Sequence, residues 1–364
     1  MTFSASSPSS DPLLPEQELW EEQPRERQQH PFAIKRVKRK PVEGIPRRGR
    51  VLEGTGRWWL VELEEPAGEL LECTVAGTLV APEESPTLIA VGDVVECLRT
   101  EESAPGGLPQ GMIVMVHPRR TKLARYRRRE GKEQVIASNV DQLIILQAVA
   151  QPPYDRFLID RYLIAAEKGD LQPVLCINKL DLGSADQVRE ELRYYAEVLG
   201  IRLILCSAQT GEGIDELRAV LTGKTSVLSG PSGVGKSTLT NLLLGSNVQQ
   251  VGPISPKLGQ GRQTTTMARM FRLPGGGYII DTPGIRELTI WELTREELPA
   301  YFPDFEPWAQ ECAYQPCSHI HEPDCAVRSA AARGQIDPVR YEHYCRLWHS
   351  LPKHAYQWRQ RRHL

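Results

Sequence analysis

No run of apolar residues in this chain of 364 residues approaches the roughly 18 that a membrane-spanning helix needs. The N-terminal Met is not followed by an apolar segment, so a secretory signal is absent. The eight cysteines are spread along the chain. Without a secretory signal they indicate a reduced compartment rather than a framework of disulfides. We therefore expect a cytoplasmic protein with no membrane partner.

A strong overall charge is also lacking, because the net charge is only −2. The charges are nevertheless segregated. Residues 1–24 contain no Lys or Arg, residues 60–103 are acidic, and residues 119–132 hold eight bases against one acid. Further basic blocks lie at 25–50 and in the last twelve residues. One such block is explained by a solvated surface, but three favour a nucleic-acid partner. The RNA-binding candidates are Arg119, Arg120, Arg125, Arg127, Arg128 and Arg129.

The N-terminal third of the chain consists of two segments that differ in amino-acid composition. Residues 1–46 are rich in Ser, Pro, Gln and charge, which predicts a disordered tail. Residues 47–118 predict a small β-barrel, for which an OB-type barrel is one candidate. Its β-rich runs, separated by Gly, Pro and acidic turns, are Trp58–Leu63, Leu70–Val75, Val91–Leu98 and Gly111–Val116. Trp58 and Trp59 are either base-stacking residues or part of the barrel core.

Residues 119–290 alternate between strands and helices, which predicts a doubly wound, mostly parallel α/β sheet. The strands are expected at 140–150, 173–177, 202–206, 226–229 and 278–280. The helices are expected at 156–168, 185–199, 214–221 and 236–244. Residues 291–364 are helical in pattern and rich in Cys and His, so we expect a multidomain chain that ends in a small helical module.

A phosphate-binding loop occupies residues 230–237, where the sequence matches GxxxxGK[ST] between an apolar strand and an amphipathic helix. Backbone N–H groups of such a loop point at phosphates, and the helix N-terminus adds positive potential. Lys236 is expected to bridge the β- and γ-phosphates as a catalytic residue, and Ser237 to ligate Mg²⁺. The nucleotide contacts expected here are Gly230, Pro231, Ser232, Gly233, Val234, Gly235, Lys236, Ser237 and Thr238.

The base is predicted by Asn178-Lys179-Leu180-Asp181, which follows the strand 173–177. The Asp181 carboxylate accepts from the N1–H and the exocyclic amine of guanine, whereas adenine would leave it unpaired. Ser207 and Ala208 follow the next strand, from which their backbone approaches the guanine oxygen. The sequence therefore predicts a site for GTP and GDP.

The remaining GTPase elements follow the phosphate loop. Asp281 begins the sequence DTPG and is expected to hold Mg²⁺ through water, while the Gly284 N–H reaches the γ-phosphate. One of three threonines at 264–266 supplies a further Mg²⁺ ligand; we take Thr265, and the choice among them stays open. A regular GTPase carries the base motif after DxxG, so this order indicates a circular permutation. Permutation is physically reasonable because chain termini often lie close together.

The residue that orients the attacking water is not evident. Many GTPases place Gln just after the DxxG glycine, but this chain has Ile285 there, which predicts slow intrinsic turnover. Gln263 is the nearest polar candidate for the catalytic role. The alternative is that Gln263 only makes a local hydrogen bond.

A metal site is predicted by the spacing C-x₄-C-x-H-x₅-C, with the ligands Cys312, Cys317, His319 and Cys325. Three thiolates and one imidazole suit tetrahedral Zn²⁺. The short polar segment would struggle to build its own core, so one structural ion would supply the order. His321 is an alternative ligand. The other cysteines are most simply ordinary thiols.

These features together resemble the RsgA (YjeQ) family of ribosome-small-subunit-dependent GTPases. The resemblance covers about residues 47–364, and a segment similar to the end of the family's barrel is His117–Thr121. The motifs that carry it are Ser138–Gln142, Asn178–Asp181, Gly230–Ser237, Gly261–Thr266, Asp281–Gly284 and the four metal ligands. The resemblance implies an OB-fold barrel, Mg²⁺-dependent GTP hydrolysis stimulated by the small ribosomal subunit, and a role with its rRNA in late assembly. The family often has His where this chain has Gln263.

Two other interpretations remain. One is an RNA-binding scaffold that uses GTP as a structural ligand, and the other is a permuted GTPase that acts on a protein or membrane partner. The clustered arginines disfavour the second interpretation.

We expect the chain to be a monomer. Because the segment after Gly284 leads into residues 291–364, we also hypothesise that nucleotide state reorients the C-terminal module.

Overall fold

The computed structural model describes residues 44–54, 57–81, 87–103, 108–127, 132–245, 268–282 and 293–353. Residues 42–364 form one compact unit, to which the following account refers. The predicted tail at 1–46 lies almost wholly outside the described residues.

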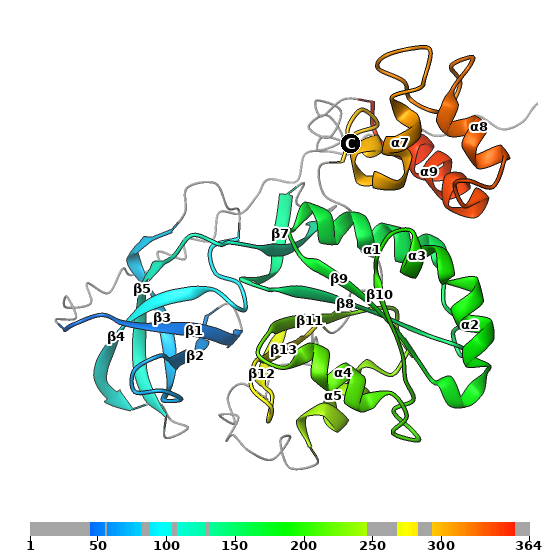
Figure 1. Cartoon of the computed structure of the whole chain (residues 1–364). Coiled ribbons are helices and arrows are strands. Elements are labelled where there is room, and N and C mark those ends of the chain that lie inside the picture. Colours follow the sequence, from blue (N-terminus) through cyan, green and yellow to red (C-terminus); the bar gives the residue numbers. More distant parts are fainter. Residues whose placement is uncertain are drawn as a thin grey trace, which may run out of the picture. The chain divides into compact units, whose positions relative to one another are not determined.

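The first part of this unit is a closed five-stranded barrel with the strand order β1-β2-β3-β5-β4 (Figure 1). Pairing of β1 with both β2 and β4 closes it. Its strands are β1 Arg47–Gly54, β2 Trp59–Leu63, β3 Leu70–Val80, β4 Val94–Ser103 and β5 Pro109–Val116. The predicted barrel is confirmed. It has one further strand, β1, which the sequence analysis did not predict because the segment is rich in arginine. Trp59 packs in the barrel core, whereas Trp58 is half-buried.

A two-stranded hairpin, β6 (Lys122–Arg127) and β7 (Lys132–Ser138), follows the barrel. Residues at the base of the hairpin join it to the barrel. The Ser138 hydroxyl donates to Asp93 Oδ1 at 2.6 Å, and the Ser138 N–H donates to the Val91 carbonyl at 2.9 Å. Gly92 is required at this junction, because its φ is +90° and a Cβ would lie 2.1 Å from the Ser138 oxygen. The sequence did not predict this hairpin.

The central sheet has six strands in the order β10-β9-β8-β11-β13-β12. The strands β10, β9, β8, β11 and β13 run parallel, and β12 pairs antiparallel with β13. This confirms the predicted doubly wound, mostly parallel sheet. The strand bounds are β8 Gln142–Ala148, β9 Gln172–Asn178, β10 Arg202–Leu205, β11 Thr225–Ser229, β12 Arg269–Arg272 and β13 Tyr278–Asp281. Every residue of β8 is buried, as expected of a strand covered on both faces.

Helices pack on both faces of this sheet. Leu143 and Ile145 of β8 lie in one core with Ile159 of α1, whereas Ile144 and Leu146 lie in a second core with α4 and α5. The helices are α1 Arg156–Lys168, α2 Ala185–Glu191, α3 Arg193–Glu197, α4 Ile214–Leu221 and α5 Lys236–Leu244, with a short 3₁₀ turn η1 at Leu180–Leu182. The helix predicted over 185–199 is broken at Leu192, which leaves helical geometry while its side chain stays fully buried.

The C-terminal module is built from helices around a core that Ile164 of α1 also joins. Phe302, Phe305 and Tyr344 pack there with three buried cysteines. The elements are η3 Leu298–Tyr301, η4 Pro303–Phe305, α7 Glu306–Ala309, α8 Ala326–Ala332 and α9 Pro338–Ser350. Within the described ranges, no helix has both the length and the apolar character to cross a membrane.

Candidate nucleotide site and metal centre

The predicted phosphate loop joins β11 to α5, and its glycines are dictated by close contacts. A Cβ at Gly230 would lie 2.0 Å from the Leu146 oxygen of β8. Gly235 is the N-cap of α5 with φ of +95°, and a Cβ there would lie 2.4 Å from Asn178 Nδ2. Any side chain at these two positions would displace neighbouring strands, so the loop lies directly on β8 and on the base motif.

Lys236 is the first residue of α5, and its ammonium bends back over the loop. Its Nζ donates to the carbonyl oxygens of Gly230 and Pro231, each at 2.7 Å. Burial lowers the pKa of Lys236, and the nearby Asp281 carboxylate partly offsets this effect. Ser237 and Thr238 follow at the exposed N-terminus of α5. The arrangement presents one cation and a helix N-terminus to an anion, which is the chemistry that phosphates need.

Asp281 ends β13 and pairs in register with Leu228 of β11. Burial raises the pKa of Asp281, while the Lys236 ammonium and the Thr282 N–H act in the opposite direction. Its Oδ1 is buried without a hydrogen-bond partner among the described residues. A buried carboxylate oxygen with no donor fits a Mg²⁺ ion, which takes oxygen ligands and keeps several waters. The candidate Mg²⁺ ligand Thr265 lies outside the described residues.

The base motif and the Ser207-Ala208 turn are held together by Asn178, which is almost fully buried. Its Oδ1 accepts from the Ala208 N–H at 3.0 Å, and its Nδ2 donates to the Val234 carbonyl at 2.9 Å. The Ser207 hydroxyl donates to Asp181 Oδ1. Three motifs far apart in sequence therefore meet at the carboxyl ends of neighbouring parallel strands, where ligands bind in open α/β sheets.

Several predicted site residues fall on segments that the structure does not describe. They are Gln263, Thr264, Thr265, Thr266, Gly284 and Ile285, together with Arg128 and Arg129 of the basic block. Their roles stay predictions.

The metal centre gathers the four predicted ligands, whose donor atoms all lie within 4.8 Å of one another. With zinc–sulfur bonds of about 2.3 Å, two sulfurs of a tetrahedral site lie about 3.8 Å apart. The Sγ atoms of Cys312 and Cys325 are 3.9 Å apart, and His319 Nδ1 lies 3.6 and 3.5 Å from them. This spacing fits a four-coordinate zinc ion. His321 is not part of the cluster, and its side chain is exposed.

The surroundings of the four ligands allow thiolates only beside a cation. Burial raises the pKa of Cys317 to about 12 and lowers the pKa of His319, so thiolates form there only when a metal ion is bound. Backbone N–H groups of His319 and Arg328 point at the sulfurs of Cys317 and Cys325, each at 3.4 Å. Such outer contacts orient ligands in zinc sites. A metal ion bound by four protein ligands has no open coordination position, which is the arrangement found in structural zinc sites.

Known proteins resemble this chain over most of its length. The family model for the RsgA GTPase matches residues 116–291. The small ribosomal subunit biogenesis GTPase RsgA of Chlorobaculum parvum is 42% identical over 308 residues, which are 83% of this chain and 97% of that protein. The chain belongs to the RsgA family of GTPases. The protein of the same name from Chlorobaculum tepidum is 43% identical over 309 residues, with the same coverage of both chains.

Solved structures of RsgA relatives share the fold. YjeQ from Thermotoga maritima superimposes with a TM-score of 0.64 at 34% identity, over 84% of this chain and 99% of that one. YloQ, described as a circularly permuted GTPase, gives a TM-score of 0.62 at 25% identity, over 86% and 97%. The chain is thus a GTP hydrolase with a circularly permuted GTPase domain, and the family implies Mg²⁺ with GTP.

The arginines of the basic block that suggested RNA binding differ in their exposure and in their partners. Arg119 is a correction: its guanidinium holds both oxygens of buried Asp93, at 2.7 and 2.8 Å, and its side chain is 8% exposed. Arg119 therefore serves the barrel rather than a polyanion. Arg120 is 72% exposed beside Asp141, and Arg125 of β6 donates to Gln134 on the facing strand at 3.1 Å. Arg127 ends β6.

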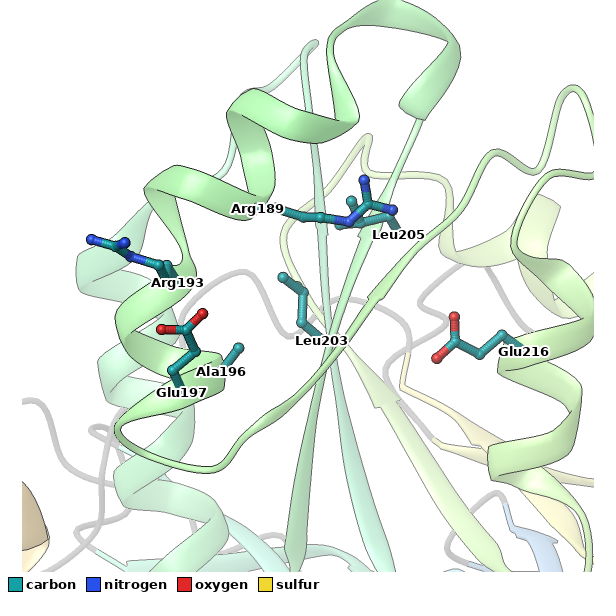
Figure 2. A pocket seen from close by; sticks show the side chains of 7 residues that line it. All are labelled: Arg189, Arg193, Ala196, Glu197, Leu203, Leu205 and Glu216. Atoms are coloured by element: carbon teal, nitrogen blue, oxygen red, sulfur yellow. The ribbon is translucent and has the colours of Figure 1, made fainter.

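A surface hollow of about 360 Å³ lies beside the edge strand β10, away from the motifs of the family (Figure 2). Figure 2 shows Arg189 and Arg193 from the α2–α3 side, Leu203 and Leu205 from β10, and Glu216 from α4. Three of its ionic groups already have partners, because Arg189 pairs with Asp186, Arg193 with Glu190 and Glu216 with Arg202. The hollow contains no predicted site residue.

Proposed function

We propose that this RsgA-family GTPase binds the small ribosomal subunit through its rRNA and acts late in assembly of that subunit. The subunit stimulates GTP turnover, and nucleotide state is transmitted to the C-terminal module. The observation that carries the proposal is the alignment with two relatives named for small ribosomal subunit biogenesis. The alignment covers 97% of the length of each relative. The chain acts as a monomer.

The proposed reaction uses the residues gathered around the phosphate loop. Asn178, Asp181 and the Ser207-Ala208 turn hold guanine, and the loop 230–238 holds the phosphates. Lys236 leaves the carbonyls of Gly230 and Pro231 to bridge the β- and γ-phosphates, where its charge stabilises the transition state. Ser237, Thr265 and Asp281 would hold Mg²⁺, which would neutralise the phosphate charge, and the Gly284 N–H would contact the γ-phosphate. Gln263 orients water once the subunit has bound.

Transmission to the C-terminal module follows from the permutation. The chain that leaves Asp281 enters the described structure again at Leu293, and Arg295 then contacts the C-terminal end of α9. Its Nε donates to the carbonyls of Trp348 and Leu351 at 2.8 and 2.9 Å, and its guanidinium lies 4.4 Å from the Trp348 ring centre. Arg295 thus fastens the start of the module to α9, and a movement passed along the chain from Gly284 would reach α9 through this residue.

The proposed RNA surface consists of Arg120, Arg125 and the adjoining residues 127–129, and the zinc ion keeps the C-terminal module ordered. Binding to rRNA through such a surface weakens steeply with salt, because each neutralised phosphate releases counterions.

Co-sedimentation with purified small subunits tests this proposal, with GDP and with a non-hydrolysable GTP analogue at two salt concentrations. We expect more chain bound with the GTP analogue, and less of it bound at the higher salt. Hydrogen exchange over 293–353 should also differ between the two nucleotides. Absence of binding in every condition refutes the ribosomal partner, and identical exchange refutes transmission.

A further inference from the structure

The turn between β8 and α1, residues 149–155, lies against the phosphate loop. A Cβ built on Gly233 would lie 3.4 Å from Pro152 Cδ and 3.7 Å from the Gln151 oxygen. Gly233 has a φ of +86°, so it is bare backbone that faces this turn. Pro152 and Gln151 therefore cover one side of the loop that wraps the phosphates.

The same turn also holds the lysine of the base motif. Lys179 adopts a left-handed conformation, and its Nζ donates to the Gln151 carbonyl. The Val149 N–H donates to the Asn178 carbonyl at 3.0 Å. One carbonyl, that of Gln151, is thus a neighbour of both Gly233 and the Lys179 ammonium. The turn therefore joins the phosphate loop to the base motif, in addition to the contacts that Asn178 makes.

Contacts at its far end make this turn a fixed support. The Tyr154 hydroxyl donates to Glu191 at the end of α2, which lowers the pKa of Glu191, and Glu191 also accepts from Gln187 at 2.9 Å. The Asp155 N–H donates to buried Gln147 at 3.4 Å, and the Asp155 carboxylate caps α1. The turn is therefore anchored to β8, α1 and α2 at once.

We propose that Gln151 and Pro152 are positioning residues that brace Gly233 and Lys179, and thereby slow the release of guanine nucleotide. The contacts involve the loop and the base motif but not Lys236 or Asp281. The brace therefore acts on binding and leaves the chemical step alone. It acts equally on GDP and GTP, because Gly233 and Lys179 belong to the motifs that hold the parts common to both nucleotides. The inference rests on the nucleotide site described above.

The test measures dissociation of fluorescently labelled GDP, and of a labelled non-hydrolysable GTP analogue, from the full chain after a chase with excess GDP. Pro152→Ala removes the ring that covers Gly233, and Pro153→Ala is the matched control at an exposed position of the same turn. We expect Pro152→Ala to speed release of both nucleotides about fivefold, the worth of roughly one buried methylene group, and Pro153→Ala to change nothing. KM for GTP should rise while kcat is unchanged.

A double-mutant cycle separates positioning from general damage. Lys179→Met removes one of the two groups that the turn contacts. In that variant Pro152→Ala should therefore accelerate nucleotide release less than it does in the parent chain. Equal rates for Pro152→Ala and Pro153→Ala, or a fall in kcat at constant KM, would overturn the proposal. If Pro152→Ala fails to fold, Tyr154→Phe replaces it, and unchanged release from that variant has the same meaning.

The assay contains no ribosome, so a negative result leaves the proposed ribosomal role untouched. Failure of the parent chain to bind labelled GDP would instead refute the nucleotide site itself, and with it this inference.

Discussion

Arg340 of α9 donates to Asp160 of α1 at 2.5 Å, and both side chains are buried. Arg340 also holds Asp304 with two hydrogen bonds of 2.9 Å, and His343 contacts the second oxygen of Asp160 at 2.6 Å. Burial opposes the charge of Arg340, but Asp160 and Asp304 outweigh it and raise the pKa. The C-terminal module is therefore fixed to the GTPase sheet through a buried ionic cluster on α1.

Breaking this cluster on one side should be costly. We expect Asp160→Asn to lower the free energy of unfolding by about 1.5–3 kcal/mol, because Arg340 loses one of its two buried carboxylate partners and keeps Asp304. Arg340→Met should cost more, about 3–5 kcal/mol, because it leaves both Asp160 and Asp304 buried without the guanidinium. Urea unfolding measures all three chains. Asp186→Asn, in an exposed pair with Arg189, is the control, and an equal effect of Asp160→Asn and the control would refute the buried cluster.

Zinc removal should unfold the C-terminal module and spare the sheet. The purified chain should carry one zinc ion, and a chelator should abolish slow hydrogen exchange over 293–353, because the ion supplies order that the small core lacks. Cys312→Ala should act like the chelator. Cys345→Ala, at a half-buried thiol outside the cluster, should retain the metal. Normal zinc content in Cys312→Ala would refute the ligand assignment.

Base choice should depend on the Asp181 carboxylate. Asp181→Asn replaces an acceptor with an amide that donates, so GDP affinity should fall at least about 100-fold. Xanthine nucleotides, which offer an oxygen where guanine has its amine, should bind better than they do to the parent chain. Competition against labelled GDP measures both changes. If guanine is still preferred in the variant, Asp181 does not read the base.

Exposed Arg120 and partly buried Arg125 should set the salt dependence of RNA binding. Replacing Arg120 and Arg125 with Gln should weaken rRNA binding and reduce the slope of log affinity against log salt by about one for each lost phosphate contact. Arg119→Gln should instead lower the melting temperature, because it leaves Asp93 buried without its partner. Filter binding over a salt series, together with thermal unfolding, tests the division. An unchanged slope in the double variant would place the RNA surface elsewhere.

Local patterns account for most of what the sequence predicts. The bounds of α1, α4 and α5 agree with the sequence analysis, because apolar period and capping are local properties; Asp155, for example, caps α1. The nucleotide motifs and metal ligands are likewise short contiguous patterns. The break at Leu192 was not predicted, because the choice between helix and buried core depends on the packing beneath it.

Long-range pairing accounts for what the sequence leaves hidden. Asp160 reads as a polar position on an amphipathic helix, and its partner Arg340 lies 180 residues away. The sequence places Arg119 in a basic block, and its partner Asp93 belongs to the acidic stretch that precedes the block. Only the fold shows that the two side chains pair. The brace at Gln151 and Pro152 carries no motif, and only the fold places it against Gly233.

The most direct test of the central claim is GTP turnover with and without purified small ribosomal subunits, at low and high salt. We predict slow turnover for the chain alone, as Ile285 indicates, strong stimulation by the subunit, and a stimulation that fades as salt rises. Gln263→Ala should remove the stimulated component. Turnover that stays slow although the subunit binds would contradict the account and favour a scaffold that holds GTP as a structural ligand.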